Sequence, residues 1–231
     1  MPGAKQIDRK TRILDAAERA FAEYGFAGAS LRHIVLEAQV NLATVYYYFE
    51  SKEGLMAAVF ERRFGPLRQE HLDLLARRKR EAKGGVLSVE QIVETMLVPP
   101  LRLAGAASTK SHANMRLIGR MVTDPNPQTQ ELLRRQHERV RAAFLEELHR
   151  SLPDLPWPDL QWRFEFFWGA VAFILCNPGK IEKSTKGVCN PADPRMVLAQ
   201  MKACFAAGFR APAAAVNEVS ILLSANETVA V

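Results

Sequence analysis

Apolar residues in this chain recur at spacings of three and four, and no stretch alternates apolar with polar residues. Such spacing places apolar side chains on one face of an α-helix, whereas a half-buried strand needs strict alternation. In the first such segment one stripe is formed by Ile13, Ala17, Ala20, Phe21 and Tyr24. Gly25 is well placed to end that helix. The sequence therefore predicts an all-α protein.

Caps and breakers divide the chain into nine expected helices. They cover about residues 7–24, 31–38, 41–48, 52–80, 89–104, 111–122, 128–151, 160–176 and 195–209. Ser30 and Asn41 stand where N-caps belong. Pro66 is expected to bend or interrupt its helix, and Pro99-Pro100 to kink the next one.

This order of helices predicts a small head followed by a larger body. We expect a three-helix head over residues 1–51, a six-helix body over 52–210 and a loosely ordered tail over 211–231. Within the body, residues 177–194 are expected to form a loop because they contain glycine, prolines and lysines.

Several classes of protein are disfavoured by what the sequence lacks. The longest apolar run, residues 166–176, is too short to span a membrane, which needs roughly 20 residues. The basic N-terminus resembles no secretory signal, so we predict a cytoplasmic protein. Cys176, Cys189 and Cys204 have neither disulfide-framework nor zinc-site spacing. No metal or cofactor is predicted.

No catalytic motif is found in the sequence. The five histidines form no HxxxH or HExxH pair, and the patterns GxSxG and GxxxxGKS are absent. We therefore predict that the chain is not an enzyme. A catalytic site assembled from distant residues and a plain helical scaffold are the alternatives.

Net charge is +6, which fits a polyanionic partner without identifying one. The excess is not in the head, because residues 1–55 carry seven basic and seven acidic residues. It lies later, notably in the basic run over residues 77–80.

Two short helices joined by a tight turn, after a longer helix, form a helix-turn-helix pattern. In the second of them, Val40, Val45 and Phe49 can face inward. The residues left mostly outward are Leu42, Ala43, Thr44, Tyr46, Tyr47 and Tyr48. Tyrosine rings can pack on sugars and thymine methyl groups, and their hydroxyls can bind phosphate. Spacing alone leaves a small helical bundle as the alternative.

The stretch from Ile7 to Phe60 resembles the N-terminal domain of the TetR/AcrR family of bacterial transcriptional regulators. The matching residues are RILDAAERAFAEYGFAGASLRHIVLEAQVNLATVYYYFESKEGL, and TVYYYFESKEGL is their most specific part. The resemblance covers about a quarter of the chain strongly. The helical remainder is compatible with the family's body.

The resemblance implies a role for each residue of the recognition surface. Thr44, Tyr48 and Lys52 would hold phosphates of double-stranded DNA. Bases or sugars would be met by Leu42, Ala43, Tyr46 and Tyr47. Arg32 would reach a base edge or a phosphate, and Asn41 would cap the recognition helix beside the DNA backbone.

The chain departs from the family at two positions where glycine is usual. Gln39 occupies the turn, and in a left-handed conformation it would cost on the order of 1 kcal/mol relative to glycine. Ala43 favours helix and offers a methyl group to thymine. The operator sequence therefore does not follow by analogy.

The helix over residues 160–176 is apolar nearly all round, and the helix over 195–209 adds small residues that allow close approach. Two such helices from each of two copies would make a four-helix interface. We predict a homodimer through them, as in the family, and burial within one subunit is the alternative. A dimer would read two inverted half-sites.

Family members also typically hold a small-molecule effector among the body helices. Candidate lining residues are Met96, Leu103, Met115, Ile118, Arg120, Met121, Phe144, Phe167 and Val171. Plain core is the alternative for the apolar ones, and a solvated basic face for Arg120. A weaker resemblance to fatty-acid and acyl-thioester sensors suggests an acyl effector. The resulting hypothesis is a repressor that the effector releases from a palindromic operator.

Overall fold

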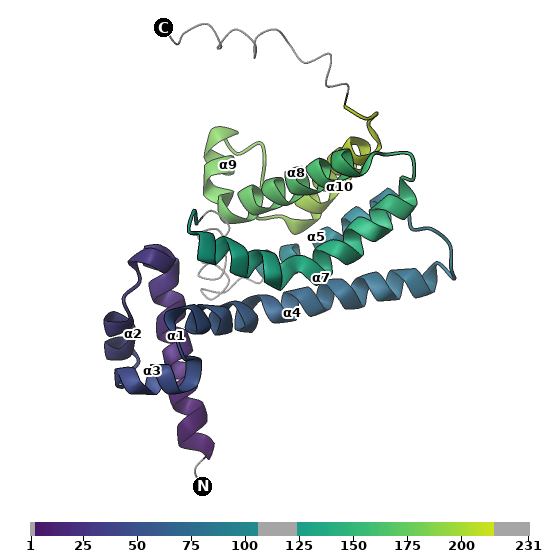
Figure 1. Cartoon of the computed structure of the whole chain (residues 1–231). Coiled ribbons are helices and arrows are strands. Elements are labelled where there is room, and N and C mark those ends of the chain that lie inside the picture. The colour runs from purple at the N-terminus through teal and green to yellow at the C-terminus, as the bar shows by residue number, and fades with distance from the viewer. Residues whose placement is uncertain (1–2, 106–123, 215–231) are drawn as a thin grey trace, which may run out of the picture.

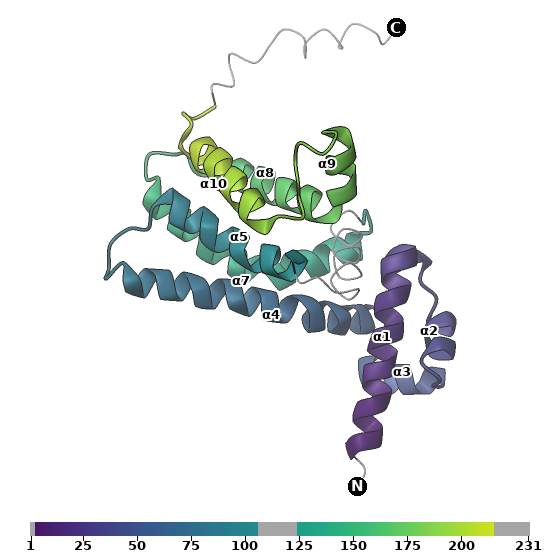
Figure 2. The same ribbon diagram turned by 180° about the vertical axis from the view of Figure 1, so that it is seen from behind.

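The structure is a computed structural model that describes residues 3–105 and 124–214, and all its elements there are α-helices (Figures 1 and 2). They are α1 (Gly3–Gly28), α2 (Leu31–Glu37), α3 (Leu42–Phe49), α4 (Lys52–Glu81), α5 (Val89–Gly105), α7 (Pro127–Ser151), α8 (Trp157–Cys176), α9 (Pro178–Ser184) and α10 (Pro194–Arg210). The predicted all-α fold is confirmed. The helix expected over 111–122 and the tail from 215 onward lie outside the described residues.

The head consists of α1, α2, α3 and the first half of α4, which share one core. Its fully buried side chains include Ile13, Phe21, Ile34, Val45, Leu55 and Phe60. The predicted inward face of α3 is confirmed, because Val45 and Phe49 are buried and Val40 packs against the same core. This shared core fixes α2 and α3 against α1 and α4.

The body forms a second core from the other half of α4 and from α5, α7, α8 and α10. Its fully buried members include Ile92, Met96, Leu97, Phe144, Leu160 and Phe167. Figures 1 and 2 show α5 and α7 lying along α4, with α8 and α10 stacked beyond them. Because α4 belongs to both cores, no flexible linker separates head and body.

A second link between head and body comes from α7 and the residues just before it. Leu132 and Leu133 of α7 pack against the head core. The backbone N–H of Phe26 donates a 3.3 Å hydrogen bond to Asp124 Oδ2, and the Thr129 hydroxyl donates to the same oxygen. The head is therefore attached to the body through both α4 and this α7 contact.

Of the bend or interruption expected at Pro66, the interruption is not found, because α4 is one helix from Lys52 to Glu81. Proline inside a helix removes an N–H and costs about 3 kcal/mol, and the burial of Phe64 and Leu75 on its two sides offsets part of that cost. The helix α5 is also continuous through Pro99-Pro100.

The loop expected over residues 177–194 contains the short helix α9. Pro178 is its first residue, a position where the missing N–H of proline costs nothing. At the other end of the chain, α1 leaves helical geometry at the predicted Gly25, with φ 70° and ψ 179°, and then makes one further turn to Gly28.

Candidate nucleic-acid interface

The outer side of α3 carries most of the residues predicted to meet DNA. Tyr47 is 73% exposed and Tyr46 is 48% exposed, and Leu42 and Ala43 are also exposed. Tyr48 is different, because its half-buried ring packs against the head core with its centroid 5.1 Å from that of Tyr47. Tyr46 and Tyr47 are therefore accessible at this surface, whereas Tyr48 anchors α3 to the head core.

Asn41 begins α3 as the sequence predicts. Its Oδ1 accepts hydrogen bonds from the Thr44 backbone N–H at 2.8 Å and from the Thr44 hydroxyl at 2.6 Å. While that hydroxyl donates to Asn41, it has no proton left for a phosphate. The amide N–H groups of exposed Asn41 are the better phosphate donors at this end of α3.

Lys52 lies at the N-terminus of α4 in a partly desolvated position. Its Nζ is 4.7 Å from the centroid of the Phe26 ring and 3.5 Å from the Ala27 carbonyl oxygen. Burial lowers the pKa of this ammonium group. The contacts hold the cation at a fixed place beside the first turn of α4, whose N–H groups also favour an anion.

A strained turn sets the angle between α3 and α4. Glu50 has φ 62° and ψ −37°, and the Ser51 N–H donates a 2.6 Å hydrogen bond to the Phe49 carbonyl oxygen two residues back. This is a γ-turn of the rare type, which costs of order 1–3 kcal/mol in a non-glycine residue. Gly54 then passes so close to Phe49 that a Cβ would overlap its carbonyl oxygen.

The turn between α2 and α3 adopts the left-handed conformation considered for it. Gln39 has φ 52°. Its N–H bonds the Leu36 carbonyl oxygen at 3.2 Å, which closes α2. The helix-turn-helix geometry is therefore retained without glycine at this position.

Ion pairs in the head are unevenly distributed, although residues 1–55 carry equal numbers of basic and acidic residues. Arg62 and Arg63 of α4 bind the nearly buried Glu18 of α1, and Arg62 also binds Asp15. Arg32, in contrast, is exposed and makes no ion pair with any residue the structure describes. Carboxylates are thus neutralised on the α4 side of the head, and cations remain free beside α3.

The basic run in the second half of α4 is largely paired. Arg77 binds Glu81 at 3.2 Å, and Arg78 binds Glu94 at 3.4 Å. Lys79 binds Glu147, a buried carboxylate of α7. These residues join α4 to its neighbours, so much of the chain's basic excess is structural.

The predicted effector residues fall into three groups. Met96, Phe144, Phe167 and Val171 lie together in the body core with at most 3% exposure, and Leu103 is half-buried. Met115, Ile118, Arg120 and Met121 lie outside the described residues. An effector cavity among these residues stays a prediction.

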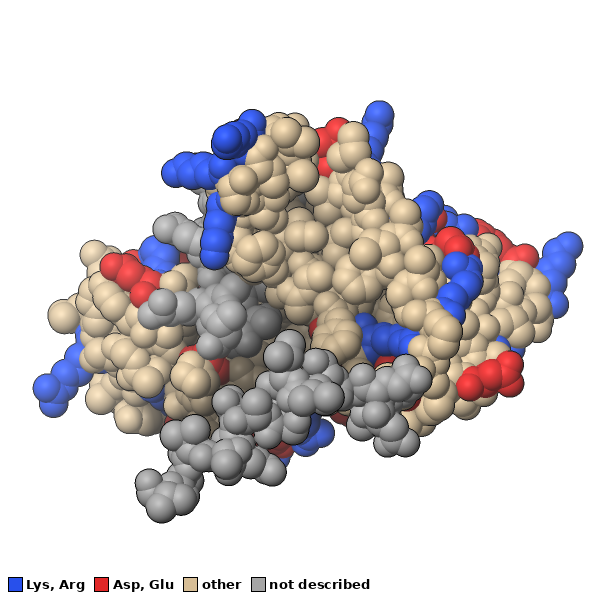
Figure 3. Space-filling model, turned by 90° about the horizontal axis from the view of Figure 1, so that it is seen from above, with Lys and Arg blue, Asp and Glu red and all other residues tan. Residues whose placement is uncertain are grey.

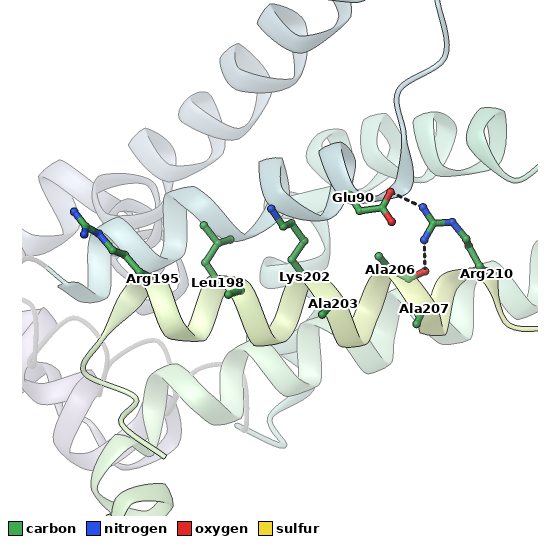
Figure 4. A pocket seen from close by; sticks show the side chains of 9 residues that line it. Glu90, Arg195, Leu198, Lys202, Ala203, Ala206, Ala207 and Arg210 are labelled. Atoms are coloured by element: carbon green, nitrogen blue, oxygen red, sulfur yellow. Dashed lines mark hydrogen bonds and ion pairs between the residues drawn. The ribbon is translucent and has the colours of Figure 1, made fainter. Parts of the chain in front are cut away.

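A hollow of about 390 Å³ lies elsewhere, along α10 beside the start of α5 (Figure 4). Three small residues of α10, Ala199, Ala203 and Ala207, form part of its wall. Arg210 binds Glu90 across it. The hollow is open, and none of the predicted effector residues lines it.

His71 of α4 is buried in the body, although no sequence pattern singles it out. Its Nε2 is 3.0 Å from the Met96 carbonyl oxygen, which lacks its helical donor because residue 100 is proline. The rings of Phe144 and Trp168 stand edge-on to it. Burial lowers the pKa of His71, and its Nδ1 lies 3.0 Å from the Leu67 carbonyl oxygen, so a neutral ring can donate its one N–H to only one of these two carbonyls.

We expect the free energy of unfolding to fall as pH falls below about 6.5. Burial lowers the pKa of both His71 and His137 in the folded state, so below the ordinary value only the unfolded chain takes up these protons. The loss is at most about 1.4 kcal/mol per pH unit for each histidine. His71→Gln, which keeps a donor for Met96, should flatten this dependence in urea titrations at pH 5–8. An unchanged slope would contradict the assignment.

Within residues 3–105 and 124–214, no group of three His, Cys, Asp or Glu side chains is placed to hold a metal ion. No helix in the same residues is long and apolar enough to cross a membrane.

Two family models match the chain, and together they cover most of it. Residues 13–59 match the model described as bacterial regulatory proteins, tetR family. Residues 94–208 match the tetracyclin repressor-like C-terminal domain.

Curated relatives match over shorter stretches. The transcriptional regulator UidR of Escherichia coli is 35% identical over 88 residues, 38% of this chain and 41% of UidR. The transcriptional repressor NicS of Pseudomonas putida is 39% identical over 67 residues, 29% of this chain and 32% of NicS. The chain thus matches less than half the length of either relative.

Solved structures match over nearly their whole length at low identity, which shows the fold. The fatty acid degradation regulator FadR from Bacillus halodurans superposes with a TM-score of 0.56 and 15% identity, covering 86% of this chain and 98% of that one. GusR of Salmonella enterica gives 0.51 and 19%, over 88% and 98%. Together with the two family models, these matches confirm the resemblance: the chain belongs to the tetR family of bacterial transcriptional regulators.

Proposed function

We propose that the chain is a homodimeric repressor in which α3 of each copy enters the major groove of one half of a palindromic operator. The observation that carries this proposal is the surface of α3. Tyr46 and Tyr47 are exposed there after the capped start of α3, and the neighbouring helices supply the cations Arg32 in α2 and Lys52 at the start of α4. Such a surface joins groups that read bases to groups that bind phosphates.

Lys52→Ala should weaken binding to every duplex and lower the slope of log Kd against log salt by about 0.9, because one phosphate contact is lost. Tyr46→Ala should also reduce the preference for the operator over a scrambled sequence. Fluorescence anisotropy at several salt concentrations measures both, with DNA from the gene's own upstream region as the trial operator. If both variants bound like the parent, the assigned surface would be wrong.

Dimerisation is supported by an apolar stripe on α8 that no described element covers. Trp162 is 64% exposed and Phe166 is 62% exposed, and Phe173 continues the same side two turns later. The face that carries α8 and α10 has a broad middle with few charged side chains, and Lys and Arg lie at its margins (Figure 3). Large exposed apolar stripes of this kind mark protein interfaces. A second copy of the chain is the occupant we propose.

Phe166→Glu should convert the dimer into a monomer, because a carboxylate buried at an apolar interface costs several kcal/mol. Sedimentation velocity reports the change directly. Val86→Glu, at an exposed apolar residue of the loop between α4 and α5, is the matched control and should leave the dimer intact. A dimeric Phe166→Glu protein would place the interface elsewhere.

An acyl effector is supported by a buried cation beside the predicted effector region. Arg68 of α4 pairs with Glu61 through Nη2, and its buried Nη1 has no hydrogen-bond partner among the residues that the structure describes. Its charge also contributes to lowering the pKa of neighbouring His137. A fatty-acid carboxylate or a coenzyme A phosphate would supply the missing acceptor next to an apolar core. FadR of Bacillus halodurans, by its title a regulator of fatty acid degradation, shares the fold.

Effector binding would shift α4 and change the spacing of the two heads, so that both recognition helices no longer fit one operator. Coupling of this kind is commonly worth about 1–3 kcal/mol. Thermal melting with fatty acids of graded length and with their acyl-CoA esters tests the effector class. An unaltered melting temperature with all of them would count against it.

A further inference from the structure

The N-terminal turns of α1 extend beyond the head core. The helix begins at Gly3, and its first buried residue from Arg9 onward is Ile13. The ten residues between Gly3 and Ile13 span about 15 Å at 1.5 Å per residue. Figures 1 and 2 both show these turns passing α3 on the side away from the body.

Two basic residues of these turns, Arg9 and Lys10, have described side chains that face solvent. Neither of them makes an ion pair with a described residue. Lys10 lies next to the recognition helix, because its Nζ is 5.9 Å from the ring centroid of Phe49, the last residue of α3. Lys10 is thereby placed beside the C-terminal end of α3.

Residues 9–11 of α1 are exposed, and exposed helical residues gain little stability because most helical stability in proteins comes from burial. The exposed cations Arg9 and Lys10 fit a polyanion better than an apolar partner. Because Lys10 also lies beside α3, the backbone of the DNA that α3 is proposed to bind fits both the charge and the position of these residues. An acidic protein segment would satisfy the charges but would not explain their place beside α3.

We propose that the first turns of α1 form a second DNA-contacting element, in which Arg9 and Lys10 bind backbone phosphates next to the groove that α3 occupies. This inference rests on the proposed function. It adds to the helix-turn-helix a contact that reads no bases, so it raises affinity for all sequences alike.

The test uses the full-length double variant Arg9→Ala/Lys10→Ala and a mixed-sequence duplex of about 40 base pairs, because phosphate contacts do not depend on sequence. Losing two contacts should lower the slope of log Kd against log salt by about 1.8 and weaken binding at least about fivefold at 0.1 M salt. The matched control is Arg80→Ala/Arg139→Ala, which removes the same charge from two exposed arginines of the body. The control should keep the parent's slope.

Three results would overturn the inference. If the Arg9/Lys10 variant kept the parent's slope while Lys52→Ala lowered it, α1 would make no contact and the proposed function would stand. If the control lost as much slope as the variant, net charge and not position would explain the effect. If the parent bound no duplex even at low salt, the proposed function would fail as well. Equal melting temperatures of parent and variants exclude misfolding as the cause.

Discussion

Gly54→Ala should destabilise the protein by more than about 2 kcal/mol, which is in the upper part of the 1–3 kcal/mol range for overpacked sites. The new Cβ would overlap the Phe49 carbonyl oxygen and lie 3.2 Å from its carbonyl carbon. Neither atom can move alone, because both belong to the backbone of the strained turn at Glu50. The turn must open, and α3 must then rotate relative to α4.

The same change should lower DNA affinity even under conditions where the variant remains folded, because the recognition helix is displaced. Urea denaturation followed by circular dichroism gives the free energy of unfolding, and anisotropy gives the affinity. Gly179→Ala is the control, since its Cβ meets nothing within 4 Å and alanine favours helix. A Gly54→Ala protein with the stability and affinity of the parent would show that the turn relaxes freely.

Glu18→Ala should cost about 3 kcal/mol, because it leaves Arg62 and Arg63 side by side without a carboxylate between them. That value is the low end of the 3–5 kcal/mol range for a broken buried ion pair, since over a quarter of each arginine side chain stays exposed. The measurement is again the free energy of unfolding.

The control for Glu18→Ala is Glu81→Ala, which removes an exposed carboxylate from its pair with Arg77. Exposed pairs of this kind contribute at most about 1 kcal/mol. If both variants lost the same stability, the contact between α1 and α4 would be an ordinary surface ion pair. Glu18→Gln, which keeps the hydrogen-bond acceptor, should fall between the two.

The parts of the site that depend on near neighbours in the sequence were predictable. Asn41 caps α3 through Thr44, three residues later, and the inward positions of Val45 and Phe49 follow from helical spacing alone. The family resemblance added roles for residues on the outer side of α3, which the structure describes but does not test.

Contacts between distant residues were not predictable. Residues 1–55 carry equal numbers of acidic and basic residues, but Glu18 is neutralised by Arg62 and Arg63, which lie outside that segment. That pairing leaves cations free beside α3, and a count by segment cannot show it. The basic character of the first residues was visible in the sequence, but its place next to α3 required the fold.

The body shows the limit of a hydrophobic pattern. Met96 and Phe144 are buried as their spacing indicates, and spacing does not distinguish a packed core from a cavity. The inward positions of His71 and Arg68 were not predicted, because a polar residue within a helical repeat usually faces solvent. Their burial depends on Pro100 and on the helices packed against α4.

The two attachments of the head determine which motions are open to it. A domain attached through a single helix could bend at that helix and could also rotate about the helix axis. The hydrogen bond from the Phe26 N–H to Asp124 and the packing of Leu132 and Leu133 hold the head at a second place. A rotation of the head about α4 therefore has to break or shift these contacts, and a movement of α4 that preserves them has to carry α1 and α7 with it.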